Sequence, residues 1–271
     1  MSPLFGEVKL VFGEAKLVNT REIPMEGVER ISISYISENI TLREAPGDAL
    51  VLNEYLSQTD PELFADVSVD GDCLTIRNGE RRRLFGMLSG HVEICLPKAF
   101  YGTLNIKTVS GKVQSTQRLT LGELTVSSTS GRIRLADTVA GTAVLYTVSG
   151  AISAADLSAY ATVHSTSGSI SIQRAEGKGE FKTISGGIDV LFASATGDIT
   201  AKSTSGRVRL GLPAAHSYYL DASTVSGGLY APVSEEMGGG KRARSGPVGV
   251  APQGTVRVST ISGRIEVYTG G

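Results

Sequence analysis

The sequence predicts an all-β fold, a single-stranded β-solenoid with coils of 18–21 residues centred on a Ser-Gly pair. Three observations predict it. A Ser/Thr-x-Ser-Gly tetrapeptide recurs along the chain, and apolar residues alternate on both sides of each copy. Glycine is abundant, at 33 of 271 residues, and tryptophan is absent. Repeats at a short period are typical of solenoids, in which each repeat buries its apolar face against its neighbours.

The repeat has eight clear copies, and their spacing defines the coil. Successive glycines are 20, 19, 18, 18, 20, 21 and 36 residues apart. They are Gly111, Gly131, Gly150, Gly168, Gly186, Gly206, Gly227 and Gly263. Each coil is therefore expected to contain a strand, a glycine corner, a second strand and a polar return.

The residues around each glycine indicate which side chains face inward. An apolar residue stands two positions after every glycine: Val113, Ile133, Ile152, Ile170, Ile188, Val208, Leu229 and Ile265. Another stands five positions before it: Ile106, Val126, Leu145, Val163, Phe181, Ala201, Ala222 and Val258. Alternation with a period of two predicts strands with one buried face. The inward positions change parity at the glycine, which predicts a corner or bulge where glycine adopts a positive φ.

The hydroxyl residues of the tetrapeptide should also stack from coil to coil. The Ser or Thr three positions before the glycine and the Ser directly before it both fall on the inward parity. Stacking would turn them into buried or half-buried hydroxyl ladders, each donating to one coil and accepting from the next. A row of nucleophiles is disfavoured, because no His or acidic residue recurs beside them.

The pattern predicts one domain over residues 1–271, with degenerate coils and a cap in 1–97 and regular coils in 98–271. Ile31–Leu42 fits a coil with Glu38 in place of glycine, and Phe85–Ile94 fits another. The near-duplicated opening, Phe5–Val18, suits a strand pair or an atypical capping coil. The glycine- and charge-rich stretch near 235–250 is expected to be a mobile loop.

Composition argues against several functions. With 26 basic and 27 acidic residues the net charge is −1, so no nucleic-acid partner is expected. Short basic clusters at Arg81–Arg83 and Lys241–Arg244 are interpreted as solvated loops. Cys73 and Cys95 are favoured as two free thiols, and no metal-ligand spacing or cofactor motif is found. No signal peptide or membrane span is expected, so the sequence as it stands predicts a cytoplasmic protein.

Three features together suggest a family: the T-x-S-G-x-I coils, the I-x-L-P segment that ends at Pro97 and the Ile31–Leu42 stretch. They resemble the bacterial putative-adhesin family, a β-solenoid domain of unknown function, over roughly residues 27 to 269. The resemblance implies a right-handed, β-helix-like fold, an adhesin role and a cell-surface association. It supplies no catalytic residues.

Outward positions one and three after the glycine predict a candidate binding site. Basic residues at these positions flank three coils that carry mainly small residues, and we call the basic set the basic stripe: Lys112, Arg132, Arg134, Arg207, Arg209 and Arg264. Arginine can make bidentate contacts to carboxylate or phosphate groups, so the stripe could bind an anionic polymer such as a glycan. The alternative is a solvated strand face whose charges discourage aggregation.

Catalysis is not expected. The outward rows are basic or small, and His91, His164 and His216 fall at different repeat offsets. The sequence therefore favours a non-catalytic adhesin-like binding or scaffold module for a polymer or protein partner. Two alternatives stay open. One is a β-helical polysaccharide-active enzyme, and the other is a self-assembling protein that forms homo-oligomers through an exposed end coil closing at Val267–Gly271.

Overall fold

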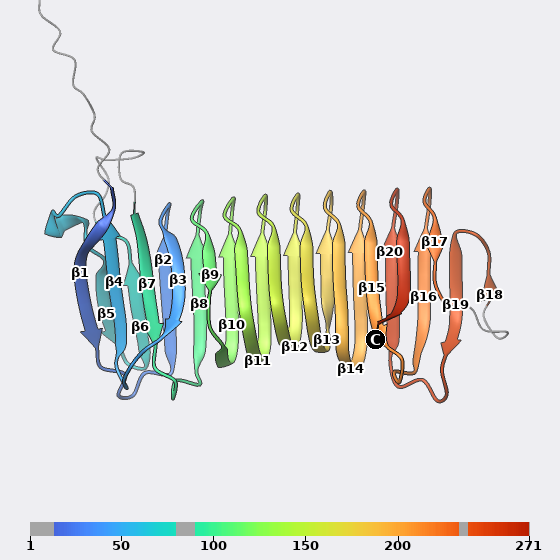
Figure 1. Cartoon of the computed structure of the whole chain (residues 1–271), viewed down its shortest axis with the longest axis horizontal. Helices are drawn as coiled ribbons and strands as arrows, with labels where there is room; N and C mark the ends of the chain where they lie inside the picture. Colours follow the sequence, from blue (N-terminus) through green and yellow to red (C-terminus); the bar gives the residue numbers. More distant parts are fainter. Residues whose placement is uncertain (1–13, 80–89, 233–237, 271) are drawn as a thin grey trace, which may run out of the picture.

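The computed structural model describes residues 14–79, 90–232 and 238–270. Its strands join in one long sheet of mixed parallel and antiparallel pairs, and the strands lie side by side along the long axis, with narrow turns aligned at one edge (Figure 1). Apart from the short 3-10 turn η1 (Pro61–Leu63), the described residues contain no helix. The chain is therefore all-β, as the sequence predicts.

The strands fall into three groups. Long strands lie in the middle of the molecule: β10 (Leu119–Ser128), β11 (Ile133–Thr147), β12 (Ile152–Ser165), β13 (Ile170–Thr183) and β14 (Ile188–Ser203). Shorter strands form the coils toward the two ends: β2 (Arg30–Tyr35), β3 (Asn39–Glu44), β6 (Cys73–Arg77), β7 (Gly90–Leu96), β8 (Thr103–Thr108), β9 (Val113–Ser115), β15 (Val208–Pro213), β16 (Tyr218–Thr224), β17 (Leu229–Tyr230), β20 (Thr255–Thr260) and β21 (Ile265–Gly270). The remaining strands lie outside the coils: β1 (Lys16–Ile23), β4 (Leu50–Leu56), β5 (Asp66–Asp70), β18 (Gly238–Gly239) and β19 (Ala243–Val248).

Equivalent residues of neighbouring coils pair in parallel register. Ile152 pairs with Ile170, and Ile170 pairs with Ile188. The apolar residues two positions after and five positions before each repeat glycine are all buried, and they belong to one continuous hydrophobic core. The inward columns that the sequence predicts are therefore confirmed. A coil whose apolar face is incomplete by itself becomes stable through contact with the next one.

The coils do not stack in sequence order at either end. β2 and β3 lie between the coil of β6 and β7 and the coil of β8 and β9, with parallel pairing on both sides. In the same way, β20 and β21 lie between β14 with β15 and β16 with β17. The first and last coils of the chain are thus each second from an end of the stack. The Ile31–Leu42 coil predicted from the sequence is confirmed, while Phe85–Ile94 is described only from Gly90 onward.

Antiparallel strands cover both ends of the stack. At one end β5 pairs with β6, β4 pairs with β7, and β1 pairs with β4. At the other end β19 pairs with β16, and β18 pairs with β19. Of the cap predicted at Phe5–Val18, Lys16–Val18 belong to β1, and residues 5–13 lie outside the described part. Covered ends of this kind hinder edge-to-edge association of strands.

Two predictions about the C-terminal part are wrong. Val267–Gly270 is not an exposed end coil, because β21 pairs along its whole length with β15 and also contacts β17. The inward residues of β21 repeat the pattern of β15, so this strand fits between two other coils. The stretch near 235–250 is not simply a loop, since β18 and β19 lie within it and β19 is held by β16.

Each Ser-Gly turn is held by a hydroxyl at its base. In the turn at Gly150, the Thr147 hydroxyl accepts a hydrogen bond from the Gly150 N–H at 3.0 Å and donates one to the Gly131 carbonyl at 3.4 Å. The hydroxyl column is therefore buried and does donate to the next coil, as the sequence predicts. It differs from the predicted ladder because it accepts from the glycine of its own coil. The Ser directly before the glycine, such as Ser149, is exposed, because the chain already turns outward there.

The repeat glycines do not adopt a positive φ, which corrects the expected reason for their presence. A Cβ on Gly150 would overlap the carbonyl oxygen of Gly131 in the neighbouring coil, and the other turns show the same close approach. Glu38 replaces glycine in its own coil, and its carbonyl occupies this position against Gly111. Glycine is required because backbone approaches backbone along this edge of the stack.

Candidate functional site

The basic stripe lies on the outer face of the strands that follow the turns. Arg134 pairs in register with Ser153, and the same row continues through Ser171, Asp189 and Arg209. Arg132 and Arg207 stand two positions earlier, in the neighbouring outward row. Both rows alternate with buried residues, so the outward orientation predicted from the sequence is confirmed. The face is flat and regular because the pairing has no bulge in these positions.

Small side chains separate the two basic ends of the stripe. The three intervening coils contribute Ala151, Ser153, Ser169, Ser171, Gly187 and Asp189. Four steps between neighbouring coils lead from Arg134 to Arg209, which corresponds to about 19 Å at the usual spacing between strands. Only Asp189 interrupts the small floor with a longer polar side chain. The arrangement leaves room for an extended ligand that contacts the floor and reaches basic groups at both ends.

The two ends of the stripe differ in their electrostatics. Within the described part of the chain, Lys112, Arg132, Arg134 and Arg207 make no ion pair with a carboxylate. Arg209, in contrast, lies 3.5 Å from Asp189 and 3.7 Å from Glu266. These pairs are solvent-exposed and weak, but they reduce the free positive charge at the β15 end. Arg132 and Arg134 therefore carry the strongest unneutralised charge of the stripe.

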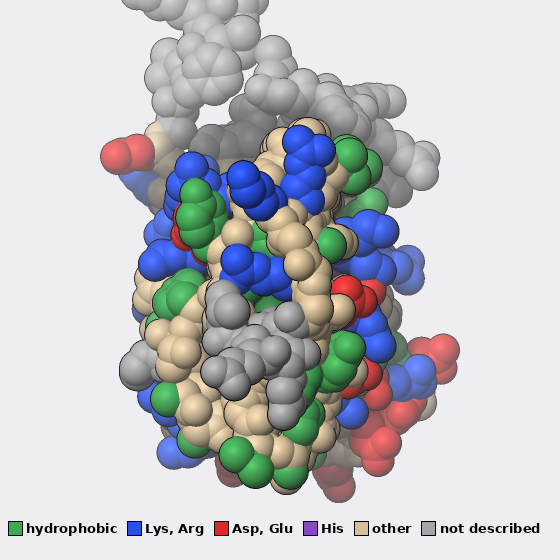
Figure 2. All heavy atoms as spheres, turned by 90° about the vertical axis from the view of Figure 1, so that its right-hand side faces the viewer, with side chains coloured by type: hydrophobic (Ala, Val, Ile, Leu, Met, Phe, Trp, Pro, Cys, Tyr) green, Lys and Arg blue, Asp and Glu red, His purple; other side chains and the backbone are tan. Residues whose placement is uncertain are grey.

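Arg264 joins the stripe through the inserted coil. Val208 pairs with Ile265, so Arg207 and Arg264 are neighbours in space although they lie 57 residues apart in the sequence. The Arg264 guanidinium lies 3.7 Å from Glu266 and 5.5 Å from the centre of the Tyr230 ring. Figure 2 shows the molecule from this end, with Lys and Arg side chains over its upper half. The sequence predicts the correct row for Arg264, but it does not predict that Arg207 is its neighbour. Nothing in the repeat pattern indicates that the coil of β20 and β21 is inserted next to β15.

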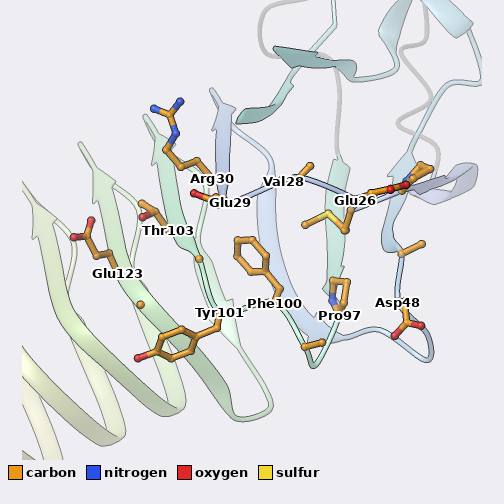
Figure 3. A pocket seen from close by; sticks show the side chains of 16 residues that line it. Glu26, Val28, Glu29, Arg30, Asp48, Pro97, Phe100, Tyr101, Thr103 and Glu123 are labelled. Atoms are coloured by element: carbon orange, nitrogen blue, oxygen red, sulfur yellow. The ribbon is translucent and has the colours of Figure 1, made fainter. Parts of the chain in front are cut away.

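A pocket that the sequence does not predict lies at the opposite edge from the turns, between β8 and the segment that precedes β2. We call it the N-terminal pocket. It has a volume of about 1000 Å³ and is lined by residues from 24–30, 48–49, 97–103 and 122–123. Figure 3 shows Phe100 between Glu123 at one end of the pocket and Asp48 at the other. Most of its residues fall in returns and caps, where the repeat is weakest, and only Arg30, Thr103, Gly122 and Glu123 of the lining lie on coil strands.

Comparison with known families assigns the chain. A model of the toastrack DUF4097 family matches residues 28–268, which covers nearly all of the stack. The chain belongs to the toastrack DUF4097 family. This confirms the resemblance to bacterial putative adhesins noted from the sequence, and the family description carries no catalytic activity. No curated protein matches the chain.

Several solved structures of bacterial proteins are similar to the chain. A putative adhesin from Bacteroides fragilis is 17% identical, and the match covers 92% of this chain and 96% of that one with a TM-score of 0.50. A putative adhesin from Parabacteroides merdae is 12% identical, with 96% and 99% covered and a TM-score of 0.46. A putative lipid binding protein from Parabacteroides distasonis is 14% identical, with 93% and 96% covered and a TM-score of 0.47.

A second polar cluster of the toastrack chain lies on the strands that precede the turns. The His164 ring nitrogen lies 3.1 Å from the Glu180 carboxylate, and Lys182 also contacts Glu180. The hydrogen bond from Lys182, and secondarily that from His164, lowers the pKa of the Glu180 carboxyl below its usual value. His164 points outward, as predicted. The cluster is an exposed set of ion pairs, and His91 and His216 lie on other strands or loops.

Among the residues that the structure describes, the cysteines and the acidic side chains do not assemble into a metal site. Cys73 and Cys95 are both free, which agrees with the interpretation favoured from the sequence. Burial raises the pKa of the Cys95 thiol, so its protonated form is favoured. Over residues 14–79, 90–232 and 238–270, no group of three or more His, Cys, Asp or Glu side chains could hold a metal ion. The same ranges contain no helix that is both long and apolar enough to span a membrane.

Of the short basic clusters, Arg81–Arg83 lies outside the described residues. Lys241–Arg244 begins before β19 and extends into it, and the Arg244 guanidinium donates a hydrogen bond to the Ala231 carbonyl at 2.9 Å. Part of this cluster is thus used to hold β19 near β17. A solvated loop was expected there, and Arg244 is instead half-buried and structural.

Proposed function

We propose that this chain is a non-catalytic, adhesin-like binding module whose basic stripe holds an anionic polymer along the axis of the stack. We infer that the stack is a right-handed β-solenoid forming a single domain, which presents the stripe as a straight, rigid surface. The membership in the toastrack family and the likeness in fold to a putative adhesin support a binding role. The surface association of adhesins makes the cell envelope the expected place of action.

The observation that carries the proposal is the register of the stripe. Parallel pairing fixes Arg134, the small residues and Arg209 in one row, at one residue per coil. A polymer with regularly spaced carboxylate, sulfate or phosphate groups can meet such a row repeatedly. Because the strands are rigid, little conformational entropy is lost when the ligand binds. Arginine, which predominates in the stripe, suits these planar and tetrahedral anions by its forked donor geometry.

The polymer is expected to be an anionic glycan. The floor offers hydroxyl groups at Ser153, Ser169 and Ser171, which can hydrogen-bond sugar hydroxyls, and it is too flat to enclose a small molecule. Its two unneutralised ends, Arg132 with Arg134 and Arg207, lie on either side of this floor. An extended anionic chain can therefore contact both ends at once, and a monosaccharide cannot.

A binding assay at two salt concentrations tests the proposal. The purified protein would be titrated with polygalacturonate, a sulfated glycan and polyphosphate, with neutral dextran as the uncharged polymer. We expect binding to at least one anionic glycan, with affinity that falls as salt rises, since exposed charges are screened. Arg132→Ala/Arg207→Ala should abolish this binding, because it removes a cation from each end of the stripe.

The matched control is Lys107→Ala/Arg257→Ala, which removes two exposed cations from the other face of the stack. It should bind the glycan like the wild type. Equal losses in both double variants would mean that net charge alone attracts the polymer, and no binding of any anionic glycan by the wild type would refute the proposal. Measurement of new reducing ends in the same mixtures tests the non-catalytic part, since their appearance would reveal an enzyme.

A further inference from the structure

The N-terminal pocket has an apolar floor with fixed walls. Val28 and Phe100 are each 9% exposed, and Met25 lies beside them, half-buried against the core. Two tight turns hold this floor, because the Val28 N–H donates to the Met25 carbonyl at 3.1 Å and the Phe100 N–H donates to the Pro97 carbonyl at 3.0 Å. The apolar floor is therefore preorganised.

The two walls of the pocket, the segment before β2 and the start of β8, are held together by backbone contacts. The Thr103 N–H donates to the Glu29 carbonyl at 2.9 Å, and a Cβ on Gly102 would overlap that same carbonyl. The segment before β2 thus packs directly on the start of β8. Gly102 and Gly122 also line the pocket.

The polar groups around the floor are predominantly acidic. Glu26, Glu29, Asp48 and Glu123 are exposed carboxylates of the lining, and none of them makes an ion pair with a described residue. Arg30 is the one basic side chain among the lining residues, and Asp72 holds it through hydrogen bonds of 2.6 and 3.1 Å. The free charge of the pocket is therefore negative.

The carboxylates are distributed along the pocket instead of gathering at one point. Glu123 lies at one end, Glu29 lies beside Arg30, and Glu26 and Asp48 lie at the other end, with Phe100 between them (Figure 3). A ligand that matches this arrangement carries positive charge on both sides of an apolar group. Its length has to be that of an extended chain, because a single cation reaches one end only.

We propose that the N-terminal pocket binds an extended peptide segment of a partner protein in which basic residues flank an apolar side chain. The apolar side chain packs on Phe100 and Met25, and the two basic groups lie near Glu123 at one end and near Glu26 and Asp48 at the other. Charge complementarity and the apolar floor together select this occupant. The pocket shares no residue with the basic stripe, so it is a second binding surface of opposite charge.

Titration calorimetry with short capped peptides tests this proposal on the whole protein. A peptide with the core Lys-Leu-Lys is the probe, and Glu-Leu-Glu, Lys-Ser-Lys and hexylammonium are its comparisons. We expect Lys-Leu-Lys to bind most tightly and Glu-Leu-Glu to show no detectable binding. Glu26→Gln and Glu123→Gln should each weaken it by about two- to fivefold, on the scale of exposed ion pairs, and both effects should shrink at high salt.

Asp221→Asn is the matched control, because Asp221 is an exposed carboxylate on β16 at the far end of the stack. It should leave peptide binding unchanged. Tyr101→Ser tests the apolar contribution at a side chain that is 65% exposed, so the fold should tolerate it. Circular dichroism would verify that each variant is folded.

Three outcomes would overturn the proposal. Equal binding of Lys-Ser-Lys would show that the apolar floor is unused, and equal binding of hexylammonium would make the pocket a site for small organic cations. Unchanged affinity in both Glu variants would place the peptide elsewhere. None of these results depends on glycan binding, so the failure of this proposal is distinct from the failure of the proposed function.

Discussion

The hydroxyl of Thr147 and the amide of Gly150 form a closed turn, with a hydrogen bond of 3.0 Å between them. The same hydrogen bond, from a glycine N–H to the hydroxyl three residues earlier, joins Gly131 to Ser128 and Gly168 to Ser165. The Thr147 and Ser165 hydroxyls also donate to the glycine carbonyl of the adjacent coil. One side chain thus satisfies a donor in its own turn and an acceptor in its neighbour, which links the geometry of each turn to the spacing of the stack.

Replacement of a repeat glycine should destabilise the protein strongly. In Gly150→Ala the new methyl group would overlap the Gly131 carbonyl, so the two coils must move apart. We expect the free energy of unfolding to fall by about 2–3 kcal/mol, as for other overpacked sites. Urea unfolding would measure it. Gly47→Ala is the control, because a Cβ there meets no atom within 4 Å, and a large loss in this variant would contradict the explanation.

Loss of the buried hydroxyl should also be costly. Thr147→Val keeps the shape of the side chain but leaves the Gly150 N–H without its bond and removes a donor from the Gly131 carbonyl. We expect a loss of about 1–3 kcal/mol, the usual cost of leaving a buried polar group unsatisfied. Thr129→Val, at an exposed turn position, should change stability little. Similar thermal unfolding of the two variants would argue against a role for the hydroxyl column.

A charge in the apolar column should disrupt several coils. Ile170 is 1% exposed and pairs with Ile152 and Ile188, so Ile170→Asp would bury an unpaired carboxylate between them. The expected destabilisation is several kcal/mol. Limited proteolysis should then cleave the middle of the chain. Ser171→Asp places the same carboxylate on the outer face and should resist the protease, and equal resistance of both variants would disprove the register.

Stability should fall at high pH because of Tyr218. Burial raises the pKa of the Tyr218 hydroxyl from its usual value of 10.0 to about 12. Above pH 10 the unfolded chain loses this proton while the folded chain retains it, so the contribution of Tyr218 to stability is complete below pH 10 and is lost as pH rises toward 12. The loss amounts to roughly 2–3 kcal/mol.

Chemical unfolding at several pH values between 10 and 12 would measure the slope of the free energy of unfolding against pH. Tyr218→Phe should flatten it, since phenylalanine has no proton to lose. Tyr219→Phe is the neighbouring control on the exposed side of the same strand, and it should leave the slope as it is. An unchanged slope in Tyr218→Phe would assign the pH dependence to other groups.

Much of the fold can be predicted from the sequence because the repeat is local. The alternation around Ile152 or Ile170 defines the buried face, and the spacing of the glycines defines the coil. The order of the coils cannot be predicted in this way. Ile265 and Val208 occupy equivalent positions in their repeats, so nothing local distinguishes a coil that follows its neighbour from one that is inserted.

The two candidate sites differ in how far the sequence predicts them, because only residues that belong to the local repeat can be assigned from their offsets. The basic stripe lies on the repeat itself, so Arg132 and Arg207 could be assigned to one face from their offsets. Of the carboxylates near Arg209, Glu266 could not be assigned from its offset, because its coil is inserted out of sequence order. The N-terminal pocket is built from loops, where Phe100 and Glu29 meet only through the tertiary structure, and no sequence period relates them.

The inserted coil of β20 and β21 has a consequence for synthesis of the protein. Coils up to β15 can stack one after another as the chain leaves the ribosome, but β16 and β17 have no docked partner at that stage. Their place is beside residues 255–270, which are made afterwards. This end of the stack therefore closes only after residues 255–270 have been made, and until then β19 is the strand with which the newly made β16 can pair.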